Sequence, residues 1–359
     1  MAPRSLTQKI LAAHGAAPDG DSIALTPRQV LLQDATGTLV MQALEAIGLD
    51  RVRVDLAVQY VDHNLIQADF RNADDHTYLR TCAEAFGIWF SAPGEGVSHP
   101  VHAHHFGRPG DFLLGSDSHT CAAGALGMIG IGAGSFDVAA ALAGVPFHLP
   151  RPKVRRITLL GAPPDRVGAK DAILTLLGRY GVAGAKGFVL EYDGPGVAAF
   201  GVMERMAIAN MGAEMGATAS VFPSDARTLA FLTHAGRPEV WQELSADPDA
   251  SYDESDTLDL SKLEPMIARP SSPDDVVTVR SVAGTPVGQA YIGSSASPGF
   301  QDVARVAALI NGRPKASGVS LDVNPATRAA LMGLVATGNM ASLLQSGARF
   351  HQIGCNGCN

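Results

Sequence analysis

Cysteine is scarce in this sequence. Only four occur among 359 residues, Cys82, Cys121, Cys355 and Cys358. That is too few for a disulfide scaffold in a chain of this length, and it fits a reducing compartment. The first fifteen residues, MAPRSLTQKILAAHG, also lack the long apolar core of a signal peptide. We therefore expect a cytoplasmic protein.

Basic residues are fewer than acidic residues, and long uninterrupted apolar runs are also rare. Lysine and arginine total 27 against 35 acidic residues, which gives a net charge of −8 and argues against a nucleic-acid surface. The most apolar stretch, 121–147, is crowded with glycines and contains Asp137, so we expect no membrane span. The remaining composition, 46% hydrophobic and 17% charged, is typical of a globular protein of two or three domains.

Strand and helix patterns alternate along the chain, which predicts an α/β fold built on largely parallel sheets. Strands are expected at 52–61, 288–295 and 318–324, and helices at 77–87, 135–144, 169–181, 201–217 and 300–313. Proline-rich and basic residues at 146–156 indicate a domain break. The predicted domains are 1–152, 153–270 and 271–359. The acidic segment 245–265 is poor in apolar residues, and we interpret it as a solvated linker or surface insertion.

One candidate site is the tetrapeptide Asp117-Ser118-His119-Thr120, which follows the apolar run FLLG. A strand is thus predicted to bring a carboxylate, a hydroxyl and an imidazole to one loop. Five glycines follow between positions 124 and 134, but they match neither GxxxxGK[ST] nor a clean GxGxxG after a strand, so a phosphate-binding loop is weakly supported. A polar strand end with glycine-mediated helix packing is the simpler alternative.

Histidines supply two further candidates. Asp62-His63 ends another predicted strand, and a carboxylate beside an imidazole is suited to proton transfer, although a surface pair is the commoner case. His99 begins a cluster of four histidines, with His102, His104 and His105. Such a cluster can bind metal, but its irregular spacing and lack of a nearby cysteine make a dedicated metal site the weaker interpretation.

Two more patterns bear on chemistry. Asn210 and Glu214 are four residues apart, so on a helix they would share one face, either in a site or simply exposed. Cys355 and Cys358 form a CxxC pair at the end of the sequence. Such a pair can be half of a zinc site, a redox pair or part of an iron–sulfur site. A second CxxC for zinc is absent.

Taken together, these motifs resemble the aconitase superfamily: aconitase, homoaconitase and the large subunit of 3-isopropylmalate dehydratase. The resemblance extends over nearly the whole chain, and the wording of its NMGAE and SVFP blocks favours the aconitase branch. The matching stretches, in chain order, are LLQDATG (31–37), VDHN (61–64), GEGVSHPVH (94–102), LLGSDSHTCAAGALGMIGIGAGSFDVA (113–139), YDGPGV (192–197), ANMGAEMGATASVFPSD (209–225), YIGSS (291–295) and GCNGC (354–358).

The resemblance implies three-layer α/β/α domains around a cleft and a [4Fe-4S] cluster, with a fourth, swivelling domain in aconitases. The implied reaction is reversible removal of water from a hydroxy-di- or tricarboxylate, here citrate or isocitrate through cis-aconitate. The implied catalytic residues are Asp62, His63, His99, Asp117, His119 and Glu214. Gln33 and Ser118 are implied to bind substrate, Asn210 to lie near the cluster, and Cys355, Cys358 and Ser295 to hold it.

Two departures from the family pattern qualify these expectations. Ser295 occupies the position of the first cluster cysteine in the motif Gly293-Ser294-Ser295, and a serine oxygen suits iron–sulfur chemistry less well than a thiolate. Cys121, beside DSHT, is an alternative ligand, although a small packed thiol is the commoner role.

The sequence also stops after CxxC, where the family continues through the third domain. We expect either a truncated chain or a separate C-terminal swivelling-domain polypeptide as partner. The alternatives to an active aconitase are an inactive protein that binds an organic acid or a partner, and a homoaconitase or 3-isopropylmalate dehydratase large subunit that needs a second polypeptide. A hydratase that uses another metal centre near His99 is a further alternative.

Overall fold

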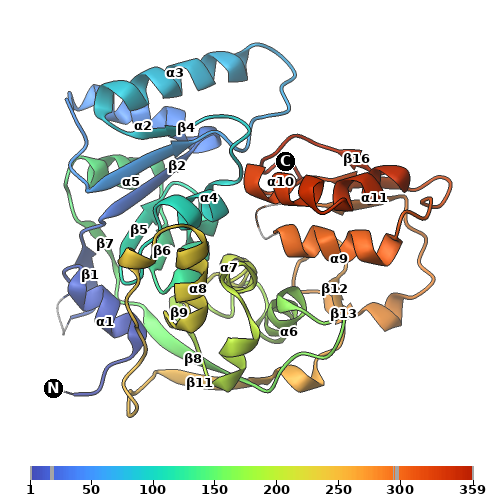
Figure 1. Cartoon of the computed structure of the whole chain (residues 1–359). Coiled ribbons are helices and arrows are strands. Elements are labelled where there is room, and N and C mark those ends of the chain that lie inside the picture. The colour runs from blue at the N-terminus through green and yellow to red at the C-terminus, as the bar shows by residue number, and fades with distance from the viewer. Residues whose placement is uncertain (1, 17–19, 294, 296–298, 358–359) are drawn as a thin grey trace.

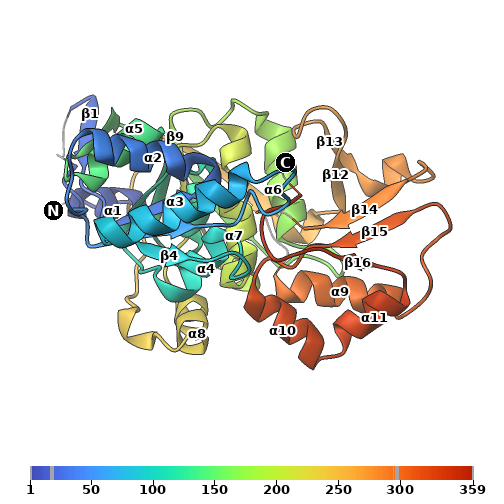
Figure 2. The ribbon, with the colours of Figure 1, turned by 90° about the horizontal axis from the view of Figure 1, so that it is seen from above.

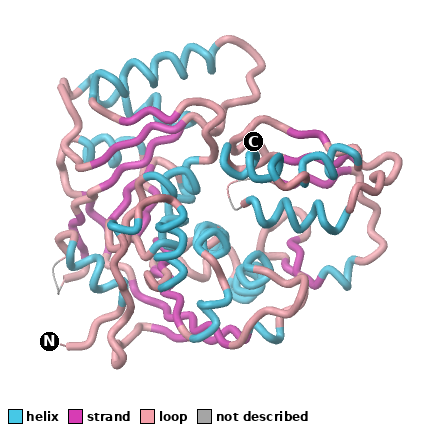
Figure 3. Tube along the Cα trace, in the orientation of Figure 1, coloured by secondary structure: helices cyan, strands magenta, loops and turns pink. Residues whose placement is uncertain are grey.

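The structure is a computed structural model that describes residues 2–16, 20–293, 295 and 299–357. It has three sheets of parallel strands, each accompanied by helices, so the predicted α/β class is confirmed (Figures 1 and 3). The proposed division at residues 152 and 270 remains a prediction.

The first sheet has five parallel strands in the order β4-β3-β2-β5-β6. It buries an apolar core that includes Leu32, Met41 and Phe112. The strands are β2 (Gln29–Gln33), β3 (Leu56–Tyr60), β4 (Trp89–Ser91), β5 (Phe112–Gly115) and β6 (Ile129–Gly132), and the antiparallel pair β1 (Ser22–Leu25) and β7 (Phe147–Pro150) lies beside them. The helices of this part are α1 (Leu6–Ala13), α2 (Asp34–Ala46), α3 (Arg71–Phe86), α4 (Ser98–His105) and α5 (Ser135–Leu142).

The second sheet has four parallel strands in the order β10-β9-β8-β11. They are β8 (Lys153–Leu160), β9 (Phe188–Asp193), β10 (Ala219–Val221) and β11 (Glu254–Asp259), with helices α6 (Ala169–Tyr180), α7 (Val202–Asn210) and α8 (Ala226–His234) and the hairpin-like pair β12 (Met266–Ala268) and β13 (Val276–Thr278). The interpretation of 245–265 as a solvated linker or surface insertion is wrong at 254–260, although 245–257 contains no buried residue. β11 pairs with β8 along its whole length, and Leu258 and Leu260 are buried.

The third sheet is the smallest, with strand order β14-β15-β16. Its elements are β14 (Gln289–Ile292), β15 (Ser320–Val323), β16 (Arg349–Phe350), α9 (Phe300–Ile310), α10 (Arg328–Ala336) and α11 (Asn339–Gln345). In two perpendicular views α7 lies at the centre of the molecule, with the first sheet on one side and α9 on the other (Figures 1 and 2). The candidate residues lie on segments that belong to all three parts of the chain, one for each sheet.

Helix ends follow local rules that the sequence carries. Helix α3 stops at Gly87, which adopts a φ of +73° and lets the chain turn in the left-handed region. The aspartate of the DSHT stretch, Asp117, accepts a hydrogen bond from the backbone of His119 and begins a 3₁₀ helix, η1 (Ser118–Leu126). η1 packs against α7, and the close approach of Gly124 to the carbonyl of Ser220 leaves no room for a Cβ. Gly124 therefore serves packing.

Candidate active site

Three polar groups meet at one edge of the first sheet. Gln33 ends β2, Asp62 follows β3, and Asp117 follows β5. β2 pairs in parallel with both β3 and β5, so the carboxyl ends of these strands lie together, which is where parallel sheets place their sites. The predicted candidates from separate motifs are thus neighbours in space.

Asp62 orients the imidazole of His63. The carboxylate is fully buried; its Oδ1 lies 2.9 Å from His63 Nδ1, and its Oδ2 accepts a hydrogen bond from the backbone of Ser98 at 2.6 Å. With Nδ1 occupied by this carboxylate, Nε2 of His63 is directed to Asp117 Oδ2, 3.6 Å away. Burial alone would lower the pKa of His63, but Asp62, Asp117 and Asp34 raise it to about 9. This imidazole is therefore protonated at neutral pH.

Asp117 is surrounded by imidazoles. His99 Nε2 lies 3.4 Å from Asp117 Oδ1, and His119 Nδ1 lies 3.7 Å from the same oxygen. The backbone of His119 donates a hydrogen bond to it at 2.7 Å. Burial would raise the pKa of Asp117, but His99, His119 and His63 outweigh burial and hold the pKa well below its usual range. One buried anion is thus kept charged by three histidines from three segments.

The third imidazole joins the first sheet to the second part of the chain. His119 Nε2 lies 3.1 Å from Glu214 Oε1. Burial would lower the pKa of His119, yet Asp117 and Glu214 raise it to about 9, while the hydrogen bond with His119 lowers the pKa of Glu214. The pair therefore exists as imidazolium and carboxylate at neutral pH.

Asn210 and Glu214 do not share one helix face, so that prediction is wrong. Helix α7 ends at Asn210, and Glu214 lies in a separate 3₁₀ turn, Ala213–Met215. The chain bends where Gly212 packs so closely against the Ser220 hydroxyl that a Cβ would overlap it. Both side-chain polar atoms of Asn210 are buried without a hydrogen-bond partner, which is uncommon for buried polar groups.

The two predicted substrate-binding residues differ in exposure. Gln33 is buried, and its Oε1 accepts a hydrogen bond from the backbone of Ala35 at 2.6 Å. Ser118 is exposed, and its hydroxyl lies 3.3 Å from His119 Nδ1. Both stand at the same sheet edge as Asp62 and Asp117, but Gln33 already caps α2.

The candidate cluster ligands lie in the third part of the chain. The side chain of Cys355 is fully buried, and its backbone amide donates a hydrogen bond to the carbonyl of Asp62 at 2.6 Å. Ser295 is also buried. Cβ atoms at Gly293 and at Gly357 would both overlap the ring of Tyr291, so the segments bearing Ser295 and Cys355 adjoin one ring. Cys358 lies outside the described residues.

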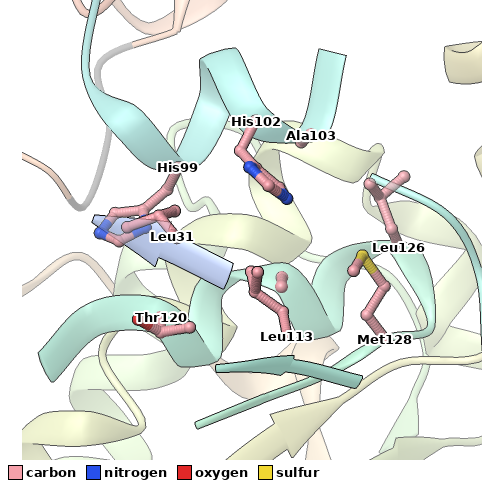
Figure 4. Close-up of a pocket in the computed structure, with 9 residues that line it drawn as sticks. Leu31, His99, His102, Ala103, Leu113, Thr120, Leu126 and Met128 are labelled. Atoms are coloured by element: carbon pink, nitrogen blue, oxygen red, sulfur yellow. The ribbon is translucent and has the colours of Figure 1, made fainter. Parts of the chain in front are cut away.

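Within the described part of the chain, the four histidines of 99–105 do not bring their ring nitrogens together as a metal site would. His102 is buried with Nδ1 2.9 Å from the Tyr60 hydroxyl and Nε2 2.8 Å from Gln29 Oε1, and burial lowers its pKa to about 3. His99 and His102 border a pocket of only about 10 Å³, otherwise lined mainly by apolar groups (Figure 4). That volume is at the lower limit for one water, so this pocket does not hold a substrate.

Cys121 is a packed thiol. It is buried, and its Sγ donates to the carbonyl oxygen of Asn210 at 3.4 Å. Burial raises its pKa to about 12, which disfavours the thiolate that a metal needs.

Sequence reasoning missed two residues beside the site, Asp34 and His76. Asp34 accepts hydrogen bonds from the backbone of Asp62, His63 and Asn64, and His76 Nε2 lies 3.2 Å from its Oδ2. A carboxylate directly after a buried strand was the available signal for Asp34. His76 lies on α3 among polar residues, and nothing in its local sequence distinguishes it.

Comparison with known proteins identifies the family of this chain. The Aconitase family (aconitate hydratase) matches residues 8–286. The large subunit 2 of 3-isopropylmalate dehydratase from Archaeoglobus fulgidus is 34% identical over 99% of this chain and 86% of its own length, and large subunit 1 from Methanopyrus kandleri is 35% identical over the same shares. The mitochondrial homocitrate dehydratase of Saccharomyces cerevisiae is 30% identical over 99% of this chain and 51% of its own length.

A solved structure has the same fold. Aconitase X from Thermococcus kodakaraensis superposes with a TM-score of 0.54 at 13% sequence identity, over 97% of this chain and 82% of that one. The family model and the relatives at 30% identity or more define an enzyme of the hydro-lyase class. The chain belongs to the aconitase family. Among the described residues, no helix is both long and apolar enough to cross a membrane.

Aconitase-family proteins typically bind a [4Fe-4S] cluster, and the described residues fit such a group in part. Cys355 offers a buried thiol beside Asp62, and Asn210 and Asn356 carry buried polar atoms without a hydrogen-bond partner. Ser295 offers a hydroxyl in place of a third thiol. The unpaired amide nitrogen of Asn210 is a buried donor of the kind that cluster sulfides accept hydrogen bonds from, whereas the unpaired atom of Asn356 is an acceptor.

Proposed function

We propose that this chain catalyses the reversible dehydration of a hydroxy-dicarboxylate of the 3-isopropylmalate type, together with a separate polypeptide. The relatives named above as dehydratase large subunits span this chain almost completely, and they support this alternative better than the citrate and isocitrate chemistry expected from the sequence. Because those relatives are named large subunits, the proposed partner is a small subunit that completes the site.

The observation that carries the proposal is the group of three imidazoles around Asp117. His63 is the proposed acid for the departing hydroxyl, because Asp62 holds its Nδ1 and leaves Nε2 directed into the site. The pKa of about 9 keeps a proton on this ring at neutral pH. General acids of this kind supply a proton to a poor leaving group in the transition state.

His119 and Glu214 form the second proton-holding pair. Their 3.1 Å contact fixes the orientation of the imidazolium, and Asp117 neutralises its other side. Ser118 and Gln33 are the proposed contacts for a substrate carboxylate, since a hydroxyl and an amide can both donate hydrogen bonds to it. Gln33 donates through its amide nitrogen while its oxygen caps α2.

Cys355, Cys358 and Ser295 are the proposed ligands of the cluster, and Asn210 lies near it. When bound, the cluster would supply a Lewis acid that polarises the substrate hydroxyl. Ser295 is the weakest member of this set, because oxygen is a harder donor than sulfur.

One cleft is large enough for a small organic acid, and none of the proposed catalytic or substrate-binding residues lines it. Its volume is about 1040 Å³, and its walls come from the second and third parts of the chain, including Lys170, Tyr291 and Gly293. Lys170 also contributes to lowering the pKa of Glu214, so one wall of the cleft lies near the His119–Glu214 pair. Ligand sites of this class commonly occupy several hundred to a thousand cubic ångströms.

The test is an anaerobic preparation analysed for iron and sulfide and assayed with 3-isopropylmalate, citrate, isocitrate and homocitrate. Each assay is run with and without the small subunit of the Archaeoglobus fulgidus enzyme. We expect iron and sulfide in the protein and turnover of 3-isopropylmalate that requires the added subunit. Cluster-loaded protein that turns over none of the four acids in either condition would contradict the proposal and favour an inactive organic-acid-binding protein.

A further inference from the structure

We propose that Asp34, together with His76, is a positioning residue for the dehydration. Its carboxylate binds the backbone amides of the turn Asp62-His63-Asn64 and so sets where His63 delivers its proton. Neither residue belongs to the catalytic or substrate-binding set inferred from the sequence, and the hydrogen bonds of Asp34 go to the turn and to His76. This inference rests on the proposed function, and it extends the site by one buried layer.

Asp34 satisfies three consecutive backbone amides. Its Oδ1 accepts hydrogen bonds from the amides of Asp62 at 3.1 Å and His63 at 2.9 Å, and its Oδ2 accepts one from Asn64 at 2.7 Å. The carboxylate is the first residue of α2, and it is 3% exposed. Buried amides without an acceptor are costly, so the turn after β3 takes this conformation because the carboxylate is there.

His76 completes the coordination of Asp34 from another helix. It projects from α3, its side chain is 12% exposed, and its Nε2 lies 3.2 Å from Asp34 Oδ2. Since a carboxylate only accepts, Nε2 carries the hydrogen and donates it. Burial would raise the pKa of Asp34, but His76 and the three amides outweigh burial and lower it. The anion is therefore present throughout the neutral range.

The same atoms could be taken for a metal site, because ligand atoms of Asp34, Asp62 and His63 lie within 4.8 Å of one another. Their hydrogen bonds argue otherwise. Both oxygens of Asp34 accept two hydrogen bonds each, Asp62 Oδ1 faces His63 Nδ1, and Asp62 Oδ2 accepts from the Ser98 amide. A cation here would have to displace these donors, so the geometry points to positioning.

The turn is held on its other side by the cysteine loop. The carbonyl of Asp62 accepts the Cys355 amide at 2.6 Å, while the amide of the same residue is bound by Asp34. Loss of the hydrogen bonds between Asp34 and the backbone of the turn would therefore let the turn shift relative to both Asp117 and Cys355. A displacement of about 1 Å in a catalytic group can cost about a hundredfold in rate.

The experiment compares D34N with D74N, H76Q and H76L in the cluster-loaded protein with its small subunit. D34N keeps the shape but turns one acceptor into a donor that faces backbone amides. D74N makes the same change at an exposed carboxylate of α3. H76Q can still donate to Asp34, whereas H76L cannot. Two measurements are made: the kcat and KM for 3-isopropylmalate, and hydrogen exchange of peptides covering 61–65 without substrate.

We expect D34N to lower kcat by about 10- to 100-fold with little change in KM, and to speed exchange at 62–64 by about tenfold or more. H76L should show the same changes more weakly. H76Q should have nearly wild-type kcat and nearly wild-type exchange at 62–64, and D74N should match the wild type in both. Wild-type exchange at 62–64 in both D34N and H76L, or rapid exchange with unchanged kcat, overturns the positioning role.

Failure of the proposed function has a different signature. It would appear as a wild-type protein without turnover, and hydrogen exchange would then still decide whether Asp34 fixes the turn. If D34N does not fold, H76L supplies the same comparison with a milder change.

Discussion

The backbone amide of Cys355 donates a hydrogen bond to the carbonyl oxygen of Asp62 at 2.6 Å. This contact joins the loop that bears the proposed cluster ligand to the turn that bears the proposed acid. It is possible because Gly354, with a φ of +152°, passes close to Leu65 and Asp62. The turn that bears the proposed acid and the cysteine loop are therefore joined by a direct backbone hydrogen bond.

Substituting Gly354 tests this contact. A Cβ there would lie 2.3 Å from Leu65 Cδ1 and 2.9 Å from the Asp62 carbonyl, so we expect Gly354→Ala to push the loop away, to lower the iron content and to cost about 1–3 kcal/mol of unfolding free energy. Gly318→Ala is the matched control, since Gly318 also has positive φ but nothing within 4 Å. Equal iron content in the two variants would count against the coupling.

The two cysteines near the site should respond oppositely to removal. Cys355→Ala should abolish iron and sulfide binding, because it deletes the buried thiol beside Asp62. Cys121→Ala should keep both and cost about 1 kcal/mol of stability, since Cys121 only packs and donates to a carbonyl. Metal analysis and denaturant unfolding distinguish them. Loss of iron from the Cys121 variant would show that Cys121 is a ligand.

Stability should fall in alkaline solution. The pKa values of His63 and His119 are raised to about 9 from 6.5, so their contribution is fully present below pH 6.5 and is lost as pH rises through about 9. A shift of that size corresponds to at most about 3 kcal/mol per histidine. Urea unfolding at pH 6, 7.5 and 9 should show the decline, and His119→Gln should flatten it. An identical loss of stability with pH in this variant would argue that deprotonation of His119 does not cause the loss.

The strand at 254–259 can be tested through its buried side chain. Leu258 is 2% exposed, so Leu258→Ala should destabilise the protein by about 2–4 kcal/mol. Thr257→Ala, at an exposed neighbouring position, should change stability by about 0.5 kcal/mol or less. Equal effects in urea unfolding would restore the interpretation of this segment as solvated.

That segment shows why part of the fold was beyond sequence reasoning. Its acidic composition indicated a linker, but β11 gains its order from pairing with β8, about a hundred residues earlier in the chain. Gly212 had a comparable effect, since its contact with Ser220 ends the helical spacing of Asn210 and Glu214. In both cases tertiary contacts decided a local conformation.

The candidate site was more predictable, because strand-end residues of a parallel sheet meet at one edge. Asp62 and Asp117 came from separate motifs and lie together with His63 between them. The sequence shows Asp34 only as a carboxylate that follows a strand. Its three amide partners depend on the path of the turn 62–64 after β3. His76 reaches Asp34 from α3, which packs against α2, and no local sequence pattern records that contact.

The central claim is that His63, oriented by Asp62, delivers the proton to the departing hydroxyl. The most direct measurement is the kcat of His63→Gln for 3-isopropylmalate in protein with wild-type iron content and the small subunit, with His105→Gln at an exposed position as control. The account predicts a loss of about 10²- to 10⁴-fold for His63→Gln and none for His105→Gln. Equal kcat values for the two variants would contradict it.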